Sequence, residues 1–213
     1  MDSSRELIQG EQGWLMARCG SLGASQIKDA LATIKSGVSA SRKNMIAQLA
    51  VERLTGQPTQ TFTTEAMQRG TDLEGAAREV YEFVTGNTVE QVGLIKHPTI
   101  RGTHASPDGL VGDQGCIEIK VPNSANHISY LLGGKVPPQY VHQVNWVMAC
   151  TGTKWCDFVS YDPRLPANTQ MFIVRVERDR KKIAEMEIAV ANFLKEVEAM
   201  VEQLEAIGMQ KAS

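Results

Sequence analysis

Residues 106–122, SPDGLVGDQGCIEIKVP, constrain the fold of this chain more than any other segment. Alternate side chains of a β-strand lie on opposite faces, so Ile117 and Ile119 share one face while Glu118 and Lys120 share the other. The isoleucine face predicts a strand in a protein core. The glycine-rich turn before it predicts a hairpin that folds the start of the segment back beside this strand.

Length and composition predict one folded domain over residues 1–213. A chain of 213 residues can form a single core. Its apolar residues, 42%, and its charged residues, 22%, match an ordinary folded protein and give no sign of extensive disorder. No internal repeat or low-complexity tract is present.

Several broad classes of protein are disfavoured. No apolar run approaches the roughly 20 residues of a membrane span, and the N-terminal segment has no apolar core fit for a secretory signal, so we expect no membrane contact and a cytoplasmic location. The four cysteines are scattered without a C-x-x-C pair, which predicts free, mostly buried thiols. A formal charge of -2 gives no global basic signature, so any positive charge for nucleic acid must be local.

Hydrophobic periodicity predicts alternating groups of helices and strands. Helices are expected around Trp14, from an N-cap at Ser25 onward, and over residues 44–54, 70–84, 138–150 and 180–207. Residues 88–119 are expected to form a small antiparallel sheet, and residues 155–162 and 170–177 two further strands. This order predicts an α+β or mixed α/β fold.

Asp108 gives the charged face of the hairpin a chemical meaning. It stands ten positions before Glu118, across the glycine-rich turn. Two carboxylates about 5 Å apart repel by roughly 3 kcal/mol at an effective dielectric near 20, and a divalent cation that binds both removes this repulsion. Mg²⁺ or Mn²⁺ would suit these oxygen ligands, and Lys120 could orient an attacking water or stabilise charge, which indicates phosphodiester hydrolysis. The alternative is an amphipathic strand on which Glu118 and Lys120 are merely solvated.

The spacing itself has a known counterpart. Pro107-Asp108, nine residues, and then Glu118-Ile119-Lys120 resembles the PD-(D/E)XK nuclease motif. That resemblance implies a restriction-endonuclease-like core, in which helices flank a central twisted mixed sheet.

Two polar residues on expected helices are further candidates. Glu74 could reach the metal site directly or through water, or it could form a capping box with Thr71 at the start of the helix over residues 70–84. Gln143 is a polar residue among apolar neighbours and needs a partner, which an active-site carboxylate, water or phosphate would supply. The alternative is a glutamine at the edge of the apolar stripe, bonded to backbone.

Several motifs in order resemble the phage lambda exonuclease and YqaJ-like viral recombinase family over about residues 13–162. They are WLMARCGSLGAS, RGTDLEGAAREVYEFVTGNTVEQVG, SPDGL, EIKVP, YVHQVNWVMACTG and WCDFVSYD. The resemblance implies a Mg²⁺-dependent exonuclease that degrades one strand of linear duplex DNA from the 5′ end, releases mononucleotides and leaves 3′ overhangs. It also implies a ring-shaped homotrimer on DNA ends, a single-strand annealing protein as partner, and a phage or prophage gene expressed in a bacterial host.

The resemblance assigns roles to individual residues. Asp108, Glu118 and the Ile119 carbonyl would bind the metal, and Lys120 would assist the attacking water. The site would be completed by Glu74, Gln143 and Tyr140. Arg18 and Ser25 would hold the 5′ phosphate; the alternatives are an exposed helix charge and a plain N-cap.

The sequence departs from the family at one position. Lambda exonuclease has another acidic residue on the strand before SPDG, but no carboxylate lies between Glu90 and Asp108 here. His97 or His104 could approach the site instead. The sequence therefore does not decide whether a second metal ion binds.

Two other functions remain as alternatives: an endonuclease of restriction or resolvase type on the same core, and a non-catalytic DNA-end-binding recombination protein. The absence of a cysteine grouping near the C-terminus disfavours an iron–sulfur nuclease.

Overall fold

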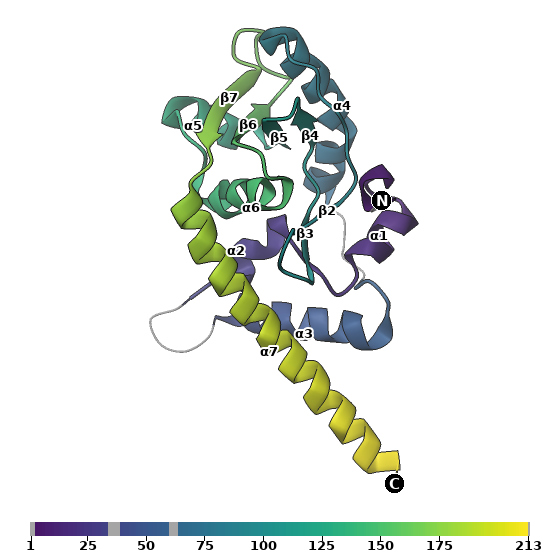
Figure 1. Cartoon of the computed structure of the whole chain (residues 1–213). Coiled ribbons are helices and arrows are strands. Elements are labelled where there is room, and N and C mark those ends of the chain that lie inside the picture. The colour runs from purple at the N-terminus through teal and green to yellow at the C-terminus, as the bar shows by residue number, and fades with distance from the viewer. Residues whose placement is uncertain (1–2, 34–38, 60–63, 213) are drawn as a thin grey trace. The chain divides into compact units, whose positions relative to one another are not determined.

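The computed structural model describes residues 3–33, 39–59 and 64–212 (Figure 1). The chain divides into two compact units, each assembled from segments that are distant in the sequence. The first unit comprises Met1–Gln60, Gly93–Ser106 and Asp179–Ser213, and the second comprises Thr61–Val92 and Pro107–Arg178. The single domain over residues 1–213 stays a prediction.

The second unit is built on a four-stranded mixed sheet. Its strands lie in the order β4 (Gly109–Val111), β5 (Gly115–Lys120), β6 (Trp155–Tyr161) and β7 (Met171–Glu177). β5 and β6 are parallel, whereas β4 pairs with β5 and β7 pairs with β6 in antiparallel fashion. The fold is thus of the expected mixed α+β class.

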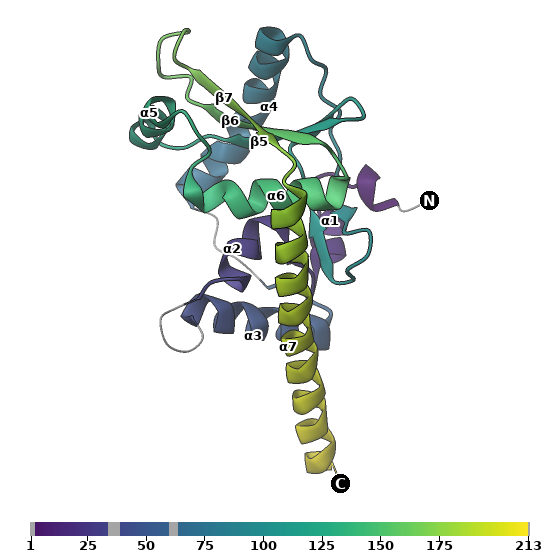
Figure 2. The ribbon, with the colours of Figure 1, turned by 60° about the vertical axis from the view of Figure 1, so that its left-hand side comes forward.

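Helices cover both faces of this sheet (Figure 2). α4 (Glu65–Thr85) packs on one face, α6 (Val141–Thr151) on the other, and α5 (Ser124–Gly133) contacts the β6–β7 side. α4 begins where the Thr64 side chain accepts a hydrogen bond from the Met67 amide, and it ends at Gly86, whose positive φ of 70° favours glycine. A short 3-10 helix, Pro138–Tyr140, leads into α6.

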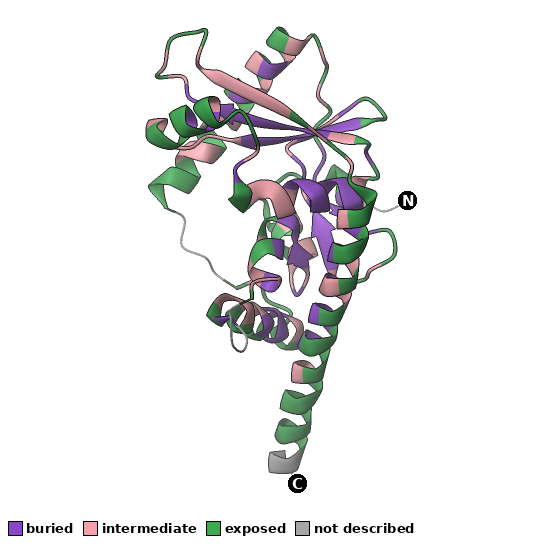
Figure 3. Ribbon diagram, turned by 90° about the vertical axis from the view of Figure 1, so that its left-hand side faces the viewer, coloured by how far each residue is buried: buried purple, intermediate pink, exposed green. Residues whose placement is uncertain are grey.

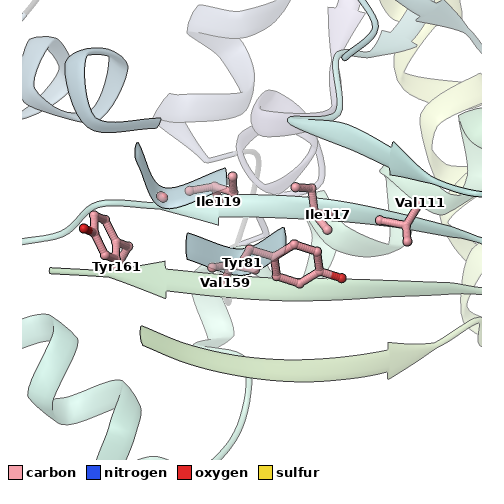
Figure 4. Close-up of a cluster of buried hydrophobic side chains, with 7 residues drawn as sticks. Tyr81, Val111, Ile117, Ile119, Val159 and Tyr161 are labelled. Carbon is pink, nitrogen blue, oxygen red and sulfur yellow. The ribbon is translucent and has the colours of Figure 1, made fainter. Parts of the chain in front are cut away.

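The isoleucine face of β5 lies in the core. Ile117 and Ile119 join Ala77, Tyr81, Val111, Val159 and Tyr161 in one buried cluster, six of which Figure 4 labels. The opposite face is also buried, since every residue of β5 from Gly115 to Ile119 is buried. Figure 3 shows the inner strands of this sheet in purple, the colour of buried residues. A strand with a parallel neighbour and helices on both faces is expected to be buried in this way.

The first unit contains a three-stranded sheet and four helices. The strands lie in the order β1 (Leu22–Gly23), β3 (Thr103–Ala105) and β2 (Ile95–Lys96). The helices are α1 (Gln12–Arg18), α2 (Ile27–Ala30), α3 (Ala40–Thr55) and α7 (Arg180–Ala212), with 3-10 helices at Ser3–Glu6 and Ala24–Gln26. α3 packs along α7, where Arg42 pairs with Glu196 at 2.6 Å and Arg53 with Glu198 at 2.8 Å.

Two local predictions were wrong, and one helix was missed. Residues 88–119 do not form one antiparallel sheet, because β2 and β3 belong to the first unit and β4 and β5 to the second. Ser25 is not an N-cap; it lies inside the 3-10 helix Ala24–Gln26, and the following α-helix has only four residues. α5 was not predicted, although Asn123 caps its start and Gly134 ends it in the left-handed conformation.

The expectation for the cysteines was confirmed. Cys116, Cys150 and Cys156 are buried thiols and Cys19 is a half-buried one, and none of the four forms a disulfide. Within the described residues, no helix combines the length and the hydropathy that crossing a membrane requires.

Candidate active site

The β4–β5 hairpin brings Asp108 beside Glu118, as the sequence predicted. Gly109 pairs with Ile117 in antiparallel register, so the preceding residue, Asp108, lies next to the position of Glu118. The Asp108 carboxylate accepts a hydrogen bond from the Ile119 amide at 2.5 Å. This bond fixes the aspartate at the edge of the strand that carries the glutamate.

Gly109 is required by a close approach of the chain. A Cβ atom at this position would lie 2.1 Å from Cγ1 of Val89, far inside van der Waals contact. The glycine of SPDG therefore allows β4 to pack closely against Val89, and this packing helps to position the preceding residue, Asp108.

Glu118 is a buried carboxylate, so the solvated-strand alternative is wrong. The residue is 1% exposed. Its Oε1 accepts hydrogen bonds from Lys120 Nζ, at 2.5 Å, and from Gln143 Nε2. Gln143 thus has a carboxylate partner, as expected from its polar character on α6. The other oxygen, Oε2, is buried and has no hydrogen-bond partner among the described residues.

Lys120 lies between a carboxylate and an aromatic ring. Its Nζ is 5.3 Å from the centre of the Tyr140 ring, within the range of a cation–π contact. Burial opposes the charge on Lys120, but Glu118 and Asp108 outweigh burial and raise its pKa. The residue is therefore an ammonium cation at neutral pH, suited to donating hydrogen bonds.

Glu74 reaches the site from the middle of α4. The helix begins at Glu65, so the alternative, a capping box with Thr71, is wrong; the Thr71 hydroxyl instead donates to the Met67 carbonyl. The Glu74 carboxylate accepts a hydrogen bond from Arg78 at 2.5 Å.

Arg78 also donates through Nε to the Asp108 carbonyl at 3.2 Å, and so links Glu74 to the hairpin. Arg78 was not predicted as a site residue. Its spacing of four residues from Glu74 on a helix was the available signal.

The three carboxylates disfavour one another's charge. Burial, with Asp108 adding to it, raises the pKa of Glu118 to about 7 against the opposing effect of Lys120. Burial and Asp108 likewise raise the pKa of Glu74 to about 7. Burial also raises the pKa of Asp108, although Lys120 and Arg78 oppose the rise. Negative charge concentrated in this way is what a divalent cation relieves.

The residues fit a cation with few protein ligands. In the chain as described, no three His, Cys, Asp or Glu side chains are already gathered around one point. The unpartnered Oε2 of Glu118 and the neighbouring Asp108 carboxylate together offer two hard oxygen ligands. Mg²⁺ keeps several waters and binds through one or two carboxylates, so this donor set suits it.

Arg18 lies in the first unit within a defined network. Its guanidinium stacks on the Trp14 ring at 4.0 Å and donates through Nε to His104 Nε2 at 3.3 Å. The His104 ring also contacts the Ser21 hydroxyl through Nδ1 at 2.8 Å, and burial together with Arg18 lowers its pKa to about 3. The Arg18 guanidinium is therefore fixed by two contacts and is not a fully exposed helix charge, and His104 is neutral at pH 7.

The remaining predicted residues also lie in the first unit. Ser25 is exposed in the 3-10 helix, and His97 pairs with Glu187 at 3.2 Å. The phosphate role of Arg18 and Ser25, and the approach of either histidine to the carboxylates, stay predictions.

Residues 13–154 match the YqaJ-like viral recombinase domain. The chain belongs to this family. The matched span includes Asp108, Glu118, Lys120, Glu74 and Gln143. A search of curated proteins gave no match.

Solved structures place this YqaJ-like chain among exonucleases. It is 49% identical to an alkaline exonuclease, LHK-Exo, from Laribacter hongkongensis, with a TM-score of 0.88 over 94% of this chain and 99% of that one. A complex of LHK-Exo with dAMP gives 48% identity and the same TM-score and coverage. A phage-related exonuclease from Haemophilus somnus shares the fold, with a TM-score of 0.69, 14% identity, and coverage of 86% and 96%. These relatives support a phage-type exonuclease that binds DNA.

Proposed function

We propose that this protein is a Mg²⁺-dependent 5′-to-3′ exonuclease that acts on linear double-stranded DNA, releases mononucleotides and leaves 3′ single-stranded overhangs. The observation that carries the proposal is the buried, unpartnered Oε2 of Glu118, beside Asp108 and two residues before Lys120 on β5. The arrangement resembles the PD-(D/E)XK motif, and solved structures similar to this chain are exonucleases, which supports the proposal.

The cation would be held by Asp108, Glu118 and the Ile119 carbonyl, with Glu74 acting through water; Mn²⁺ is expected to substitute. When bound, Mg²⁺ lowers the pKa of a water molecule and polarises the phosphate that is attacked. Among the described residues of the second unit, no further carboxylate joins Asp108, Glu118 and Glu74 as a second ligand set, so we propose one metal as the minimum.

The surrounding side chains have separate tasks. Gln143 donates to Oε1 of Glu118 and so fixes the direction of the other oxygen. Lys120 carries the positive charge that stabilises the phosphate oxygens as charge accumulates in the transition state. The Tyr140 ring stabilises the Lys120 ammonium group through a cation–π contact. Arg78 holds Glu74 and the Asp108 backbone together.

The 5′ polarity is proposed to come from Arg18 and Ser25, which would bind the terminal phosphate. The mononucleotide product is supported by the relative that was crystallised with dAMP. A homotrimeric ring, a single-strand annealing partner and action in the cytoplasm of a bacterial host are proposed from the family alone. In a ring, local cations could line the channel although the whole chain carries a net charge of -2.

The test compares linear duplex DNA with covalently closed circles. With Mg²⁺ the protein should digest linear duplex and leave circles intact, and chelation should stop digestion. Glu118→Gln should be folded and inactive, and Lys135→Gln, an exposed charge on the same unit, should be active. Internal cleavage of supercoiled circles would replace the proposal with an endonuclease, and binding of ends without any hydrolysis would replace it with a non-catalytic protein.

A further inference from the structure

The end of β6 carries a charged cluster that the proposed hydrolysis does not use. Its centre is Asp162, whose carboxylate is 0% exposed. Arg164 donates to it through Nε at 2.8 Å and Nη2 at 2.9 Å, Ser124 through its hydroxyl at 2.6 Å, and Arg69 through Nη2 at 3.4 Å. These four residues are called the Asp162 cluster.

The cluster has an excess of positive charge. Hydrogen bonds from Arg164, and then from Ser124, hold the pKa of Asp162 well below its usual range, so the carboxylate is ionised. One guanidinium is enough to pair a buried carboxylate, but two are present. Both arginines remain accessible, with side-chain exposures of 52% for Arg164 and 29% for Arg69.

Each arginine also keeps unused donors in a fixed orientation. A guanidinium has five N–H groups, and the described contacts use two of them on Arg164 and two on Arg69. The turn that carries Arg164 is held by its own amide, which donates to Asp162 Oδ1 at 3.1 Å, and by Gln170, which donates to the Leu165 carbonyl at 2.9 Å. A side chain fixed in this way loses little entropy when it binds a ligand.

The cluster lies just beyond the C-terminal ends of β5 and β6, and Lys120 is the last residue of β5. Lys120 pairs with Ser160 in the parallel register, and Pro122 and Asp162 each follow two residues later. Arg69 joins the two chain segments, since its Nη1 donates to the Pro122 carbonyl at 3.2 Å. Arg69 therefore lies against both chain segments, two residues beyond the matched strand positions of Lys120 and Ser160.

We propose that Arg69 and Arg164 form a phosphate clamp that holds the DNA backbone next to the bond being cut, with Asp162 as its anchor. The ligand class is a nucleic-acid phosphate rather than a base, because guanidinium groups bind phosphate oxygens without reading sequence. The inference rests on the proposed nuclease function and names a further substrate contact of the same site.

The test measures affinity for a short 5′-phosphorylated linear duplex over a range of salt concentrations, in chelator so that no digestion occurs. Loss of one phosphate contact should make the slope of log affinity against log salt shallower by about 0.7 to 0.9 and weaken binding about tenfold at low salt. Arg164→Gln and Arg69→Gln should each show this change. Arg164→Lys should keep the slope of the unaltered protein, and Lys135→Gln is the matched control for removal of an exposed charge.

A merely structural role predicts a different pattern. It would lower the melting temperature of both glutamine variants and leave the salt slope of the folded protein unchanged, which would overturn the clamp. If Arg164→Gln does not fold, Arg69→Gln decides by the same slope. With Mg²⁺, the clamp also predicts that KM rises while kcat stays within about twofold. Absence of digestion by the unaltered protein would sink the nuclease proposal and leave the slope measurement valid.

Discussion

At the scale of single residues, Glu118 carries a charge that the fold opposes. Its pKa is raised from 4.5 to about 7, so between these pH values the folded protein binds a proton that the unfolded chain has released. Stability of the metal-free protein should therefore fall as the pH rises through this window, the reverse of the behaviour of a carboxylate with a lowered pKa.

Glu118→Gln keeps the side-chain shape and removes the charge. Unfolding by urea in chelator, at about pH 5 and about pH 8, should show a larger loss of stability for the unaltered protein than for the variant. Mg²⁺ should restore stability at the higher pH only where Glu118 is present. If the unaltered protein and the variant lose the same stability between about pH 5 and about pH 8, Glu118 does not carry a buried charge.

Lys120 is expected to act on the reaction rather than on metal binding. Lys120→Gln removes the cation beside Glu118 and should lower kcat by about 10²- to 10³-fold, the size of a lost charge-stabilising donor. The melting temperature of this variant should still rise with Mg²⁺, because Asp108 and Glu118 remain. A variant with unaltered kcat would remove Lys120 from the chemistry.

At the scale of elements, the β4–β5 hairpin positions the carboxylates through Gly109. Gly109→Ala places a Cβ atom against Val89, and overpacking of this kind destabilises by about 1 to 3 kcal/mol. Activity should fall as well, since Asp108 is the next residue. Gly133→Ala is the control, because nothing lies within 4 Å of a Cβ there.

A second substitution tests the cause. Val89→Ala in the Gly109→Ala background removes the atom that the new Cβ meets, so it should recover part of the activity measured on linear duplex. If the double variant is no more active than Gly109→Ala, the close approach to Val89 is not what requires the glycine.

The sequence predicted this hairpin because its signals are local. Period-two alternation placed Ile117 and Ile119 in the core, and a glycine turn placed Asp108 beside Glu118. The partner of Gln143 could also be foreseen, because a buried amide must find one.

Other features depend on contacts between distant segments and escaped prediction. Burial of Glu118 follows from α6 covering the second face of β5, which strand periodicity does not reveal. The division of residues 88–119 between two sheets depends on pairing with β1, a strand of only two residues. The Asp162 cluster is formed by residues from α4, α5 and the segment after β6. Because these residues are far apart in the sequence, no local pattern predicts the cluster.

At the scale of the whole molecule, the proposed ring predicts a mass. Light scattering of the purified protein at micromolar concentration should give three times the mass of one chain. A ring enclosing DNA would also stay bound to one duplex for many cycles, so partly digested strands should be processed before new ones are attacked when DNA is in excess. The mass of a single chain would contradict the ring.

The central claim is hydrolysis of one strand of linear duplex, from its 5′ end, with Mg²⁺. The most direct measurement follows release of label from linear duplexes marked at either the 5′ or the 3′ end of one strand, with a terminal 5′ phosphate or a 5′ hydroxyl, in Mg²⁺ or in chelator. A Mg²⁺-dependent 5′-to-3′ exonuclease should release the 5′ label early as a mononucleotide, digest faster with the 5′ phosphate, and release no label in chelator. Early release of the 3′ label, or equal release without Mg²⁺, would contradict it.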